Sequence, residues 1–299
     1  MGLLKRKDNK VEKADSPPDD MATPAEKSDA ANQKVTLFAC LLGSVASIGG
    51  FMFGYVSGQI SGFFLMNDFA RRFGEQNADG SFEFSAARQG SIVGFLSIGC
   101  LIGALLSGKV ADTIGRRLAI SASAFFSCIG IIIEISSSDH WVQFAMGRMV
   151  NGLGIGSLSV VVPMYQSESS PIIIRGLLIA LYQLFVCLGI WCSNMINYGT
   201  EAMESSASWR IPNGVGFLWA LILGGGILFL PESPRFAYRA GREEEARLTI
   251  ARLAGVESDE QGVVNQINEI RVKLDEERAG ADAKWHEVFT GSCRSEWSF

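Results

Sequence analysis

Residues 35–67 read VTLFACLLGSVASIGGFMFGYVSGQISGFFLMN, without a single Asp, Glu, Lys, Arg or His. A charge-free run of about 18 or more mostly apolar residues is long enough to cross the roughly 30 Å hydrocarbon core of a bilayer as a helix. Nearly all the apolar content of the 299-residue chain lies between residues 35 and 231, whereas a soluble domain would distribute it in alternating patterns. The stretch therefore predicts a membrane protein.

Five more apolar runs bring the predicted number of membrane-spanning helices to six: Gln89–Gly108, Leu118–Ile133, Trp141–Ser167, Gly176–Thr200 and Ile211–Pro231. The third of the six spans is the shortest, and only Arg148 interrupts the fourth. We expect an all-α membrane protein in which residues 35–231 form a bundle of two three-helix units.

The two ends of the chain are polar. Residues 1–34 combine prolines and mixed charges with few large apolar groups, which predicts a disordered tail. Residues 232–290 carry two helical patterns, Arg242–Leu253 and a segment with apolar residues from Val264 to Leu274 at helical spacing, so we expect short cytoplasmic helices there. Sixteen Lys and Arg residues fall on the side of the N-terminus and four on the other, which predicts that both ends are cytoplasmic.

Composition argues against several classes of protein. A net charge of −5 without a basic face is unlike a nucleic-acid-binding protein. The six cysteines lack metal-ligand spacing and are expected to be packing residues, so we predict no metal and no cofactor. Only His140 and His286 are present, and no Cys stands near either with a plausible base geometry, which argues against an enzyme.

Two ionisable residues lie deep in the predicted spans, where an uncompensated charge is costly. Arg148 needs a carboxylate, a carbonyl or an aqueous cavity. Glu134 lies five residues before Asp139, and we expect its side chain to reach the outer interface.

Small residues spaced three or four apart let helix backbones touch, and they indicate either tight packing or faces that slide. They occur at Gly90, Gly94, Gly99, Gly103, Gly152, Gly154 and Gly156.

The fifth span contains three amides, Gln183, Asn194 and Asn197, which either bind the hydroxyl groups of a polyol-like ligand or join helices. Aromatic side chains from Phe51 to Tyr55 in the first span form either a wall for such a ligand or ordinary packing.

The turn between the second and third spans reads GKVADTIGRR, residues 108–117, and resembles the signature loop of the major facilitator superfamily. Its glycines allow a tight turn, and Asp112 can meet a neighbouring helix N-terminus. Arg116 and Arg117 can bind carboxylates or the carbonyls at a helix C-terminus.

Three more stretches resemble the sugar porter family, and most closely fungal hexose transporters. They are Gly147-Arg148 with the glycines that follow, PMYQSESSP at 163–171 ending in Arg175-Gly176, and PESPR at 231–235. The resemblance covers residues 35–290. It implies the N-terminal half of a major facilitator fold that carries a sugar across the membrane by alternating access.

The resemblance also implies roles for single residues. Gln183 would bond sugar hydroxyls, with Phe53, Ile190 and Asn194 beside it in the cavity. A charge network on the inner side would hold the outward-open state, and we group Arg148 with its gating residues. The network comprises Asp112, Arg116, Arg117, Glu168, Arg175, Glu232 and Arg235.

Two departures from the family pattern are visible. Proton-coupled relatives commonly carry an Asp after Phe-Gly-Tyr in the first span, but here Val56 follows Tyr55, which favours facilitated diffusion. Glu134 or Glu168 could titrate instead, so proton symport stays open. Family members also continue into a second six-span half, whereas this chain ends at Phe299 after residues 291–299 that diverge from the family.

We therefore expect a truncated hexose carrier of the plasma membrane. Its partners would be membrane lipid, a small sugar, and a second half or a second copy of the chain. The alternative from another class is a sugar sensor of the same fold that transports little.

Overall fold

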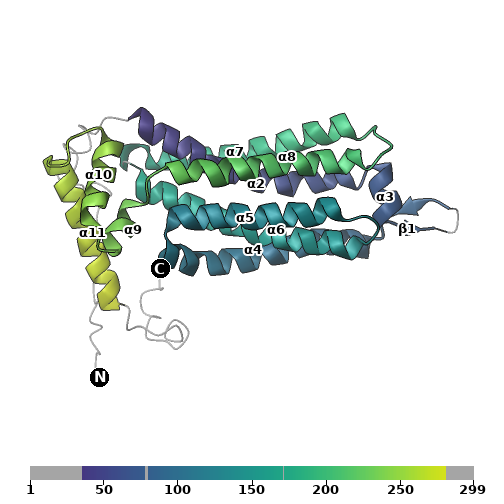
Figure 1. Ribbon diagram of the computed structural model, residues 1–299, viewed down its shortest axis with the longest axis horizontal. Coiled ribbons are helices and arrows are strands. Elements are labelled where there is room, and N and C mark those ends of the chain that lie inside the picture. The colour runs from purple at the N-terminus through teal and green to yellow at the C-terminus, as the bar shows by residue number, and fades with distance from the viewer. Residues whose placement is uncertain (1–35, 78–79, 171, 281–299) are drawn as a thin grey trace, which may run out of the picture.

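The computed structural model describes residues 36–77, 80–170 and 172–280. The long helices lie alongside one another, with further helices at one end of the bundle and a small hairpin at the other (Figure 1). We call these the α11 end and the hairpin end. The predicted tail 1–34 and the divergent residues 291–299 lie outside the described residues.

Six helices of the described chain are long and apolar enough to cross a membrane, which confirms the predicted number of spans. The chain is a multi-pass, all-α membrane protein. The six helices are α2 (Leu37–Phe63), α4 (Ala86–Ile114), α5 (Arg116–Ser136), α6 (Trp141–Ser169), α7 (Ile172–Thr200) and α8 (Ala207–Gly226). Helix α4 extends past the predicted span at both ends, because charged side chains such as Arg88 and Lys109 can reach water there.

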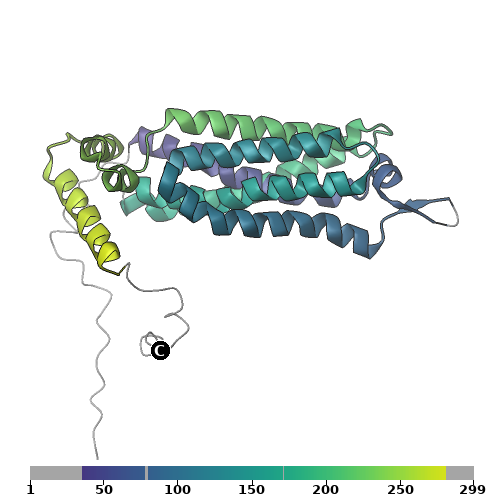
Figure 2. The ribbon, with the colours of Figure 1, turned by 60° about the horizontal axis from the view of Figure 1, so that its bottom comes forward.

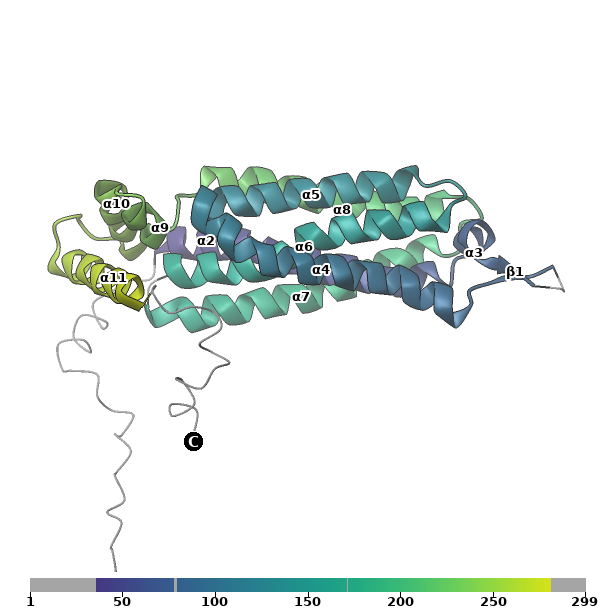
Figure 3. The same cartoon turned by 90° about the horizontal axis from the view of Figure 1, so that it is seen from below.

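Helices α2 and α6 lie at the centre of the bundle. Helix α2 packs on α7, α6 packs on α4 and α5, and α5 packs on α8. Seen from below, α5 and α7 lie along opposite edges (Figure 3). The pairing of α2 with α7 is matched by that of α6 with α4, as two related three-helix units would give.

Glycines bring these helices into backbone contact. A Cβ added to Gly54 of α2 would lie 2.0 Å from the Val186 carbonyl oxygen of α7, and one added to Gly156 of α6 would lie 2.3 Å from the Cys100 carbonyl oxygen of α4. Tight packing is therefore the role of most of the predicted small residues. Gly90 and Gly94 differ, since nothing lies within 4 Å of a Cβ added at either position.

The hairpin end carries elements that the sequence patterns did not predict. Helix α2 ends at Phe63 and is followed by α3 (Asn67–Phe73), β1 (Glu75–Gln76) and β2 (Phe82–Glu83). The two strands pair antiparallel, with Gln76 opposite Phe82. Buried aromatic rings hold α3 to the bundle, and the Asp68 carboxylate accepts hydrogen bonds from the Trp209 indole (3.2 Å) and from Arg72 (2.8 Å).

The α11 end consists of a 3-10 turn η1 (Ile227–Phe229) and three helices, α9 (Pro234–Arg239), α10 (Glu243–Ala254) and α11 (Gln261–Gly280). Helices α10 and α11 lie where the apolar spacing predicts helices, and Figure 2 shows them beside the end of the bundle. Thr36 ties α10 to α2, because its hydroxyl accepts from the Ala39 amide (3.2 Å) and donates to the Leu253 carbonyl (2.7 Å).

The close contact between α2 and α7 predicts the effect of a larger residue at Gly54. We expect Gly54→Val to lower the free energy of unfolding by about 1–3 kcal/mol, because the Val186 backbone cannot move aside as a flexible side chain can. Unfolding of the purified chain by SDS in mixed micelles measures this. Gly225→Ala, at an open position of α8, is the matched control, and an equal loss in both variants would contradict the prediction.

Candidate functional site

The turn between α4 and α5 carries a buried arginine cluster at the α11 end. The Arg116 side chain is only 3% exposed, and it forms two hydrogen bonds with the two carboxylate oxygens of Glu168 (3.0 and 3.2 Å). Arg116 also pairs with Asp112 (2.9 Å), one helical turn earlier. A planar guanidinium can satisfy several acceptors at once, so this residue ties the ends of α4, α5 and α6 together.

Glu232 binds the N-terminus of α5. Its carboxylate accepts hydrogen bonds from the backbone amides of Arg116 (3.0 Å), Arg117 (3.2 Å) and Ser233 (2.9 Å). An anion is favourable at this position because the first amides of a helix lack intrahelical partners and carry partial positive charge. Gly115 leaves room for it, since its φ is +98° and a Cβ there would lie 2.5 Å from a Glu232 carboxylate oxygen.

Two details of the signature loop were predicted wrongly. Asp112 was expected at a helix N-terminus, but it pairs with the side chains of Arg116 and Arg239 (3.2 Å), and Glu232 takes the N-terminal position instead. Gly108 was expected in a turn, but it lies inside α4, so Gly115 alone makes the turn.

The cluster has further members that the family pattern did not name. The Ser233 hydroxyl donates to Glu168 (2.5 Å), and Arg239 joins through Asp112. Arg117 donates to the Leu230 carbonyl at the end of η1 (3.3 Å), which is the type of partner predicted for it. Side-chain contacts thus connect Asp112, Arg116, Glu168, Ser233 and Arg239, and Glu232 joins them through backbone amides. Their role in gating stays a prediction.

Arg175 and Arg235 line a solvent-open cavity of ≈ 170 Å³ with Glu168, Glu269 and Lys273. The cavity is closed on one side by α11, which the sequence pattern predicted as a helix but not as a cover for the charged loop.

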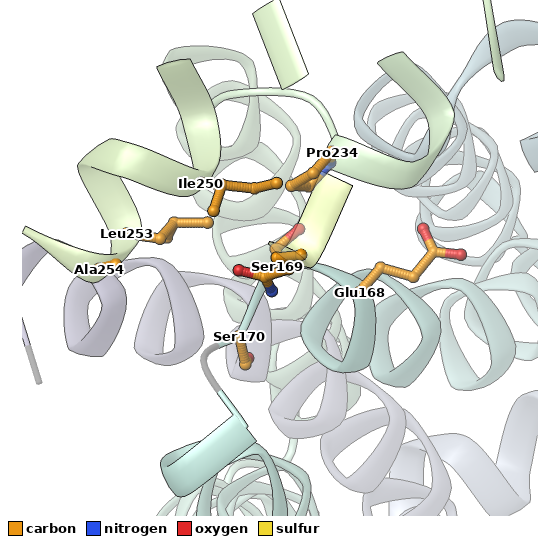
Figure 4. A pocket seen from close by; sticks show the side chains of 8 residues that line it. Glu168, Ser169, Ser170, Pro234, Ile250, Leu253 and Ala254 are labelled. Atoms are coloured by element: carbon orange, nitrogen blue, oxygen red, sulfur yellow. The ribbon is translucent and has the colours of Figure 1, made fainter. Parts of the chain in front are cut away.

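A smaller pocket shares Glu168 and Gln266 with this cavity. In Figure 4, Ile250 of α10 points toward Pro234, whereas the Glu168 carboxylate points away from the pocket. Apolar packing therefore holds α10 against α9, and the charged groups lie outside this contact.

The two deep ionisable residues are both fully buried, with 0% exposure. Arg148 does not belong to the cluster at the α11 end. It lies between helices and donates to the Val56 carbonyl oxygen of α2 (3.3 Å), so it does not face a watery crevice. Glu134 was expected at the outer interface, but it points to α6 and accepts from Asn151 (3.1 Å), because Gly147 lets α6 lie directly against it.

The predicted sugar-binding residues of α7 share one face. Gln183, Ile190 and Asn194 follow at i, i+7 and i+11, which places them in one row of the helix. Gln183 is exposed, Ile190 is 39% exposed, and Asn194 is half-buried with its amide donating to the Ile190 carbonyl (2.8 Å). Phe53 of α2 is half-buried and packs against the core instead of standing free.

The other polar and aromatic candidates join helices. Asn197 is buried and donates to the Gln59 carbonyl of α2 (2.8 Å), and the Tyr55 hydroxyl donates to the Pro212 carbonyl of α8 (2.8 Å). The Phe51 ring lies 4.8 Å from that of Trp219. For these residues the packing interpretation is the one that the structure supports.

Comparison with known proteins agrees with this architecture. The sugar (and other) transporter family matches residues 42–297. The low-affinity glucose transporter HXT4 of Saccharomyces cerevisiae is 40% identical over 260 residues, which are 87% of this chain and 45% of that protein. A low-affinity glucose transporter of Kluyveromyces lactis is 39% identical over 258 residues, 86% of this chain and 46% of that protein. The chain therefore spans less than half the length of these relatives.

Solved structures of the xylose transporter XylE share the fold. The complex with 6-bromo-6-deoxy-D-glucose aligns at a TM-score of 0.73 and 24% identity over 83% of this chain and 56% of that one. A partially occluded inward-open form from E. coli aligns at 0.69 over 81% and 60%. The six-helix bundle is thus half of a major facilitator fold.

The chain belongs to the sugar transporter family. This is a family of membrane carriers and not of enzymes.

The Glu232 contacts predict a stability effect. We expect Glu232→Gln to lower the free energy of unfolding by about 1–2 kcal/mol, because the neutral amide loses the charge interaction with the N-terminus of α5. Thermal unfolding of the detergent-purified chain measures it. Glu269→Gln removes an exposed carboxylate in the middle of α11 as a control, and unchanged stability of Glu232→Gln would disprove the capping role.

Proposed function

We propose that this chain forms the N-terminal half of a facilitative hexose carrier that works by alternating access. It would lie in the plasma membrane with its α11 end and both termini in the cytoplasm. The Lys and Arg excess at this end supports that orientation. The substrate class follows from the hexose carriers to which the chain is similar.

The exposed amide of Gln183 is the observation that carries the proposal. Helix α7 has a buried row that packs on α2 and an exposed row of large apolar side chains suited to lipid, Leu177, Leu184, Leu188, Trp191 and Met195. Gln183 and Asn194 lie in a third row between these two. An exposed amide has no place against acyl chains, so this row suits a water-filled passage, where Gln183 can exchange hydrogen bonds with sugar hydroxyls.

The low burial of the outer helices α4 and α7 supports the presence of a second half or a second copy of the chain. Only 28% of the α4 span and 22% of the α7 span are buried, against 61% for α6. Carriers of this fold bind their substrate between two halves, so a six-helix half offers one side of the site. A second half or a second copy of the chain would supply the other side, together with lipid around the remaining faces.

The cluster around Arg116 suits a gate. Its charged pairs lie at the end of the bundle, where water can solvate them when they separate, and rocking carriers need contacts that can break and reform. Arg175 and Arg235 line the cavity next to Glu168, where groups from a partner half could reach them.

Facilitated diffusion is supported by the surroundings of Arg148. Its contact on α2 is the Val56 carbonyl oxygen, and a valine side chain cannot take up and release a proton. Proton symport through Glu134 or Glu168, and a sensor with little transport, are the competing outcomes of the experiment below.

Co-expression tests the proposal. In yeast that lacks hexose transporters, we expect the chain together with the second half of HXT4 to restore saturable glucose uptake that a protonophore leaves unchanged. The chain alone should restore much less. Loss of uptake with the protonophore would indicate symport. No uptake in either arrangement, with the chain present in the plasma membrane, would refute the carrier and favour a sensor.

Gln183 provides a sharper test within that system. We expect Gln183→Ala to lower glucose uptake at subsaturating sugar about tenfold, since one hydrogen bond to a sugar hydroxyl contributes about 1.4 kcal/mol. Leu184→Ala, at the neighbouring position in the apolar row, is the matched control and should leave uptake close to that of the unmodified chain. Equal uptake by both variants would exclude Gln183 from the binding site.

A further inference from the structure

Glu134 of α5 and Arg148 of α6 have opposite charges, and both are buried inside the helix bundle. Neither side chain has exposed surface. A lone buried charge is strongly destabilising unless an opposite charge or hydrogen bonds compensate it. The stability of the bundle with a charged Arg148 therefore depends on the groups that surround Arg148 and Glu134.

Each of the two residues has one hydrogen-bond partner, and no hydrogen bond joins them to each other in the described part of the chain. Glu134 accepts one hydrogen bond, from the Asn151 amide at 3.1 Å, and Arg148 donates one, to the Val56 carbonyl at 3.3 Å. The second carboxylate oxygen of Glu134 and two guanidinium nitrogens of Arg148 have no partner in the described part of the chain. Glu134 packs on Gly147, the residue directly before Arg148, and its hydrogen-bond partner Asn151 follows Arg148 by three residues on the same side of α6.

Glycines build the space for this pair. A Cβ on Gly147 of α6 would lie 2.8 Å from the Glu134 side chain, and a Cβ on Gly130 of α5 would lie 2.3 Å from the Asn151 backbone nitrogen. Each helix thus presents a glycine opposite the polar side chain of the other. The arrangement turns the Glu134 side chain toward α6, the helix that also carries Arg148.

We propose that Glu134, held in place by Asn151, is the fixed counter-charge of Arg148. In proton-coupled relatives, the residue at the position of Val56 is commonly an Asp. Glu134 would replace that Asp as the negative charge that neutralises Arg148. Glu134 is a positioning residue, since it acts through Arg148 and lies away from the Gln183 row. Its meaning for transport rests on the proposed function. With the counter-charge on α5, α2 needs no carboxylate of its own to neutralise Arg148.

A cycle of variants tests the pairing in the full 299-residue chain, purified in detergent. We expect E134Q to lower the melting temperature by about 5 °C or more, because it leaves the Arg148 charge unpaired without changing the side-chain volume. Adding R148M to E134Q should restore most of the loss, since no charge then remains. Adding V56D to E134Q should also restore it, because the new carboxylate starts from the residue whose carbonyl Arg148 already contacts.

Recovery of the melting temperature on adding R148M distinguishes a charge interaction between the two residues from a general loss of packing. D68N is the matched control: it removes a nearly buried carboxylate that pairs with Arg72 at the hairpin end, and R148M should not rescue it. If E134Q yields no folded chain, recovery of a monodisperse protein in the double variants is the readout. Additive losses in E134Q with R148M, or an unchanged melting temperature in E134Q alone, would overturn the proposal.

Uptake in the co-expression system adds a functional readout. We expect E134Q to reduce glucose uptake severalfold and V56D to restore it in the E134Q background. Absence of uptake in the unmodified chain would count against the proposed function, whereas the melting temperatures would still decide whether Glu134 and Arg148 pair.

Discussion

Direct backbone contact between helices is the constraint on which the bundle depends. Lipid tails are as apolar as leucine, so spans gain little from meeting through large apolar side chains. Gly54 of α2 and Gly156 of α6 let their neighbours approach until a single methyl group would not fit. The same close approach encloses Glu134 and Arg148, so the packing of the spans and the burial of the two charges have one origin.

The number of spans could be predicted from the sequence because charge-free length is a one-dimensional property. The predicted helices in the tail followed for a similar reason, since the spacing of Ile267 and Leu274 reports a helical face without knowledge of its partner. The hairpin end could not be predicted in this way. Its elements are too short for a periodic pattern, and the contact of Asp68 that joins α3 to the bundle is made with Trp209, which is distant in sequence.

The charged residues show where sequence reasoning reaches its limit. The types and positions in the signature loop pointed to a cluster, and Arg116 does bind Glu168. The assignment of partners failed for Asp112 and Glu232, because either carboxylate could meet a helix N-terminus and only the path of the chain after α8 decides between them. For Glu134, distance from the end of the span was a poor guide, since the direction of its side chain is set by the glycine opposite.

The one-residue connection at Gly115 has a mechanical consequence. Neighbouring Cα atoms are about 3.8 Å apart, so the adjoining ends of α4 and α5 cannot separate during any rearrangement of the protein. At the hairpin end, α4 instead continues into a strand and α5 into a loop. Any change in the separation of α4 and α5 is therefore smallest at Gly115 and largest at the hairpin end.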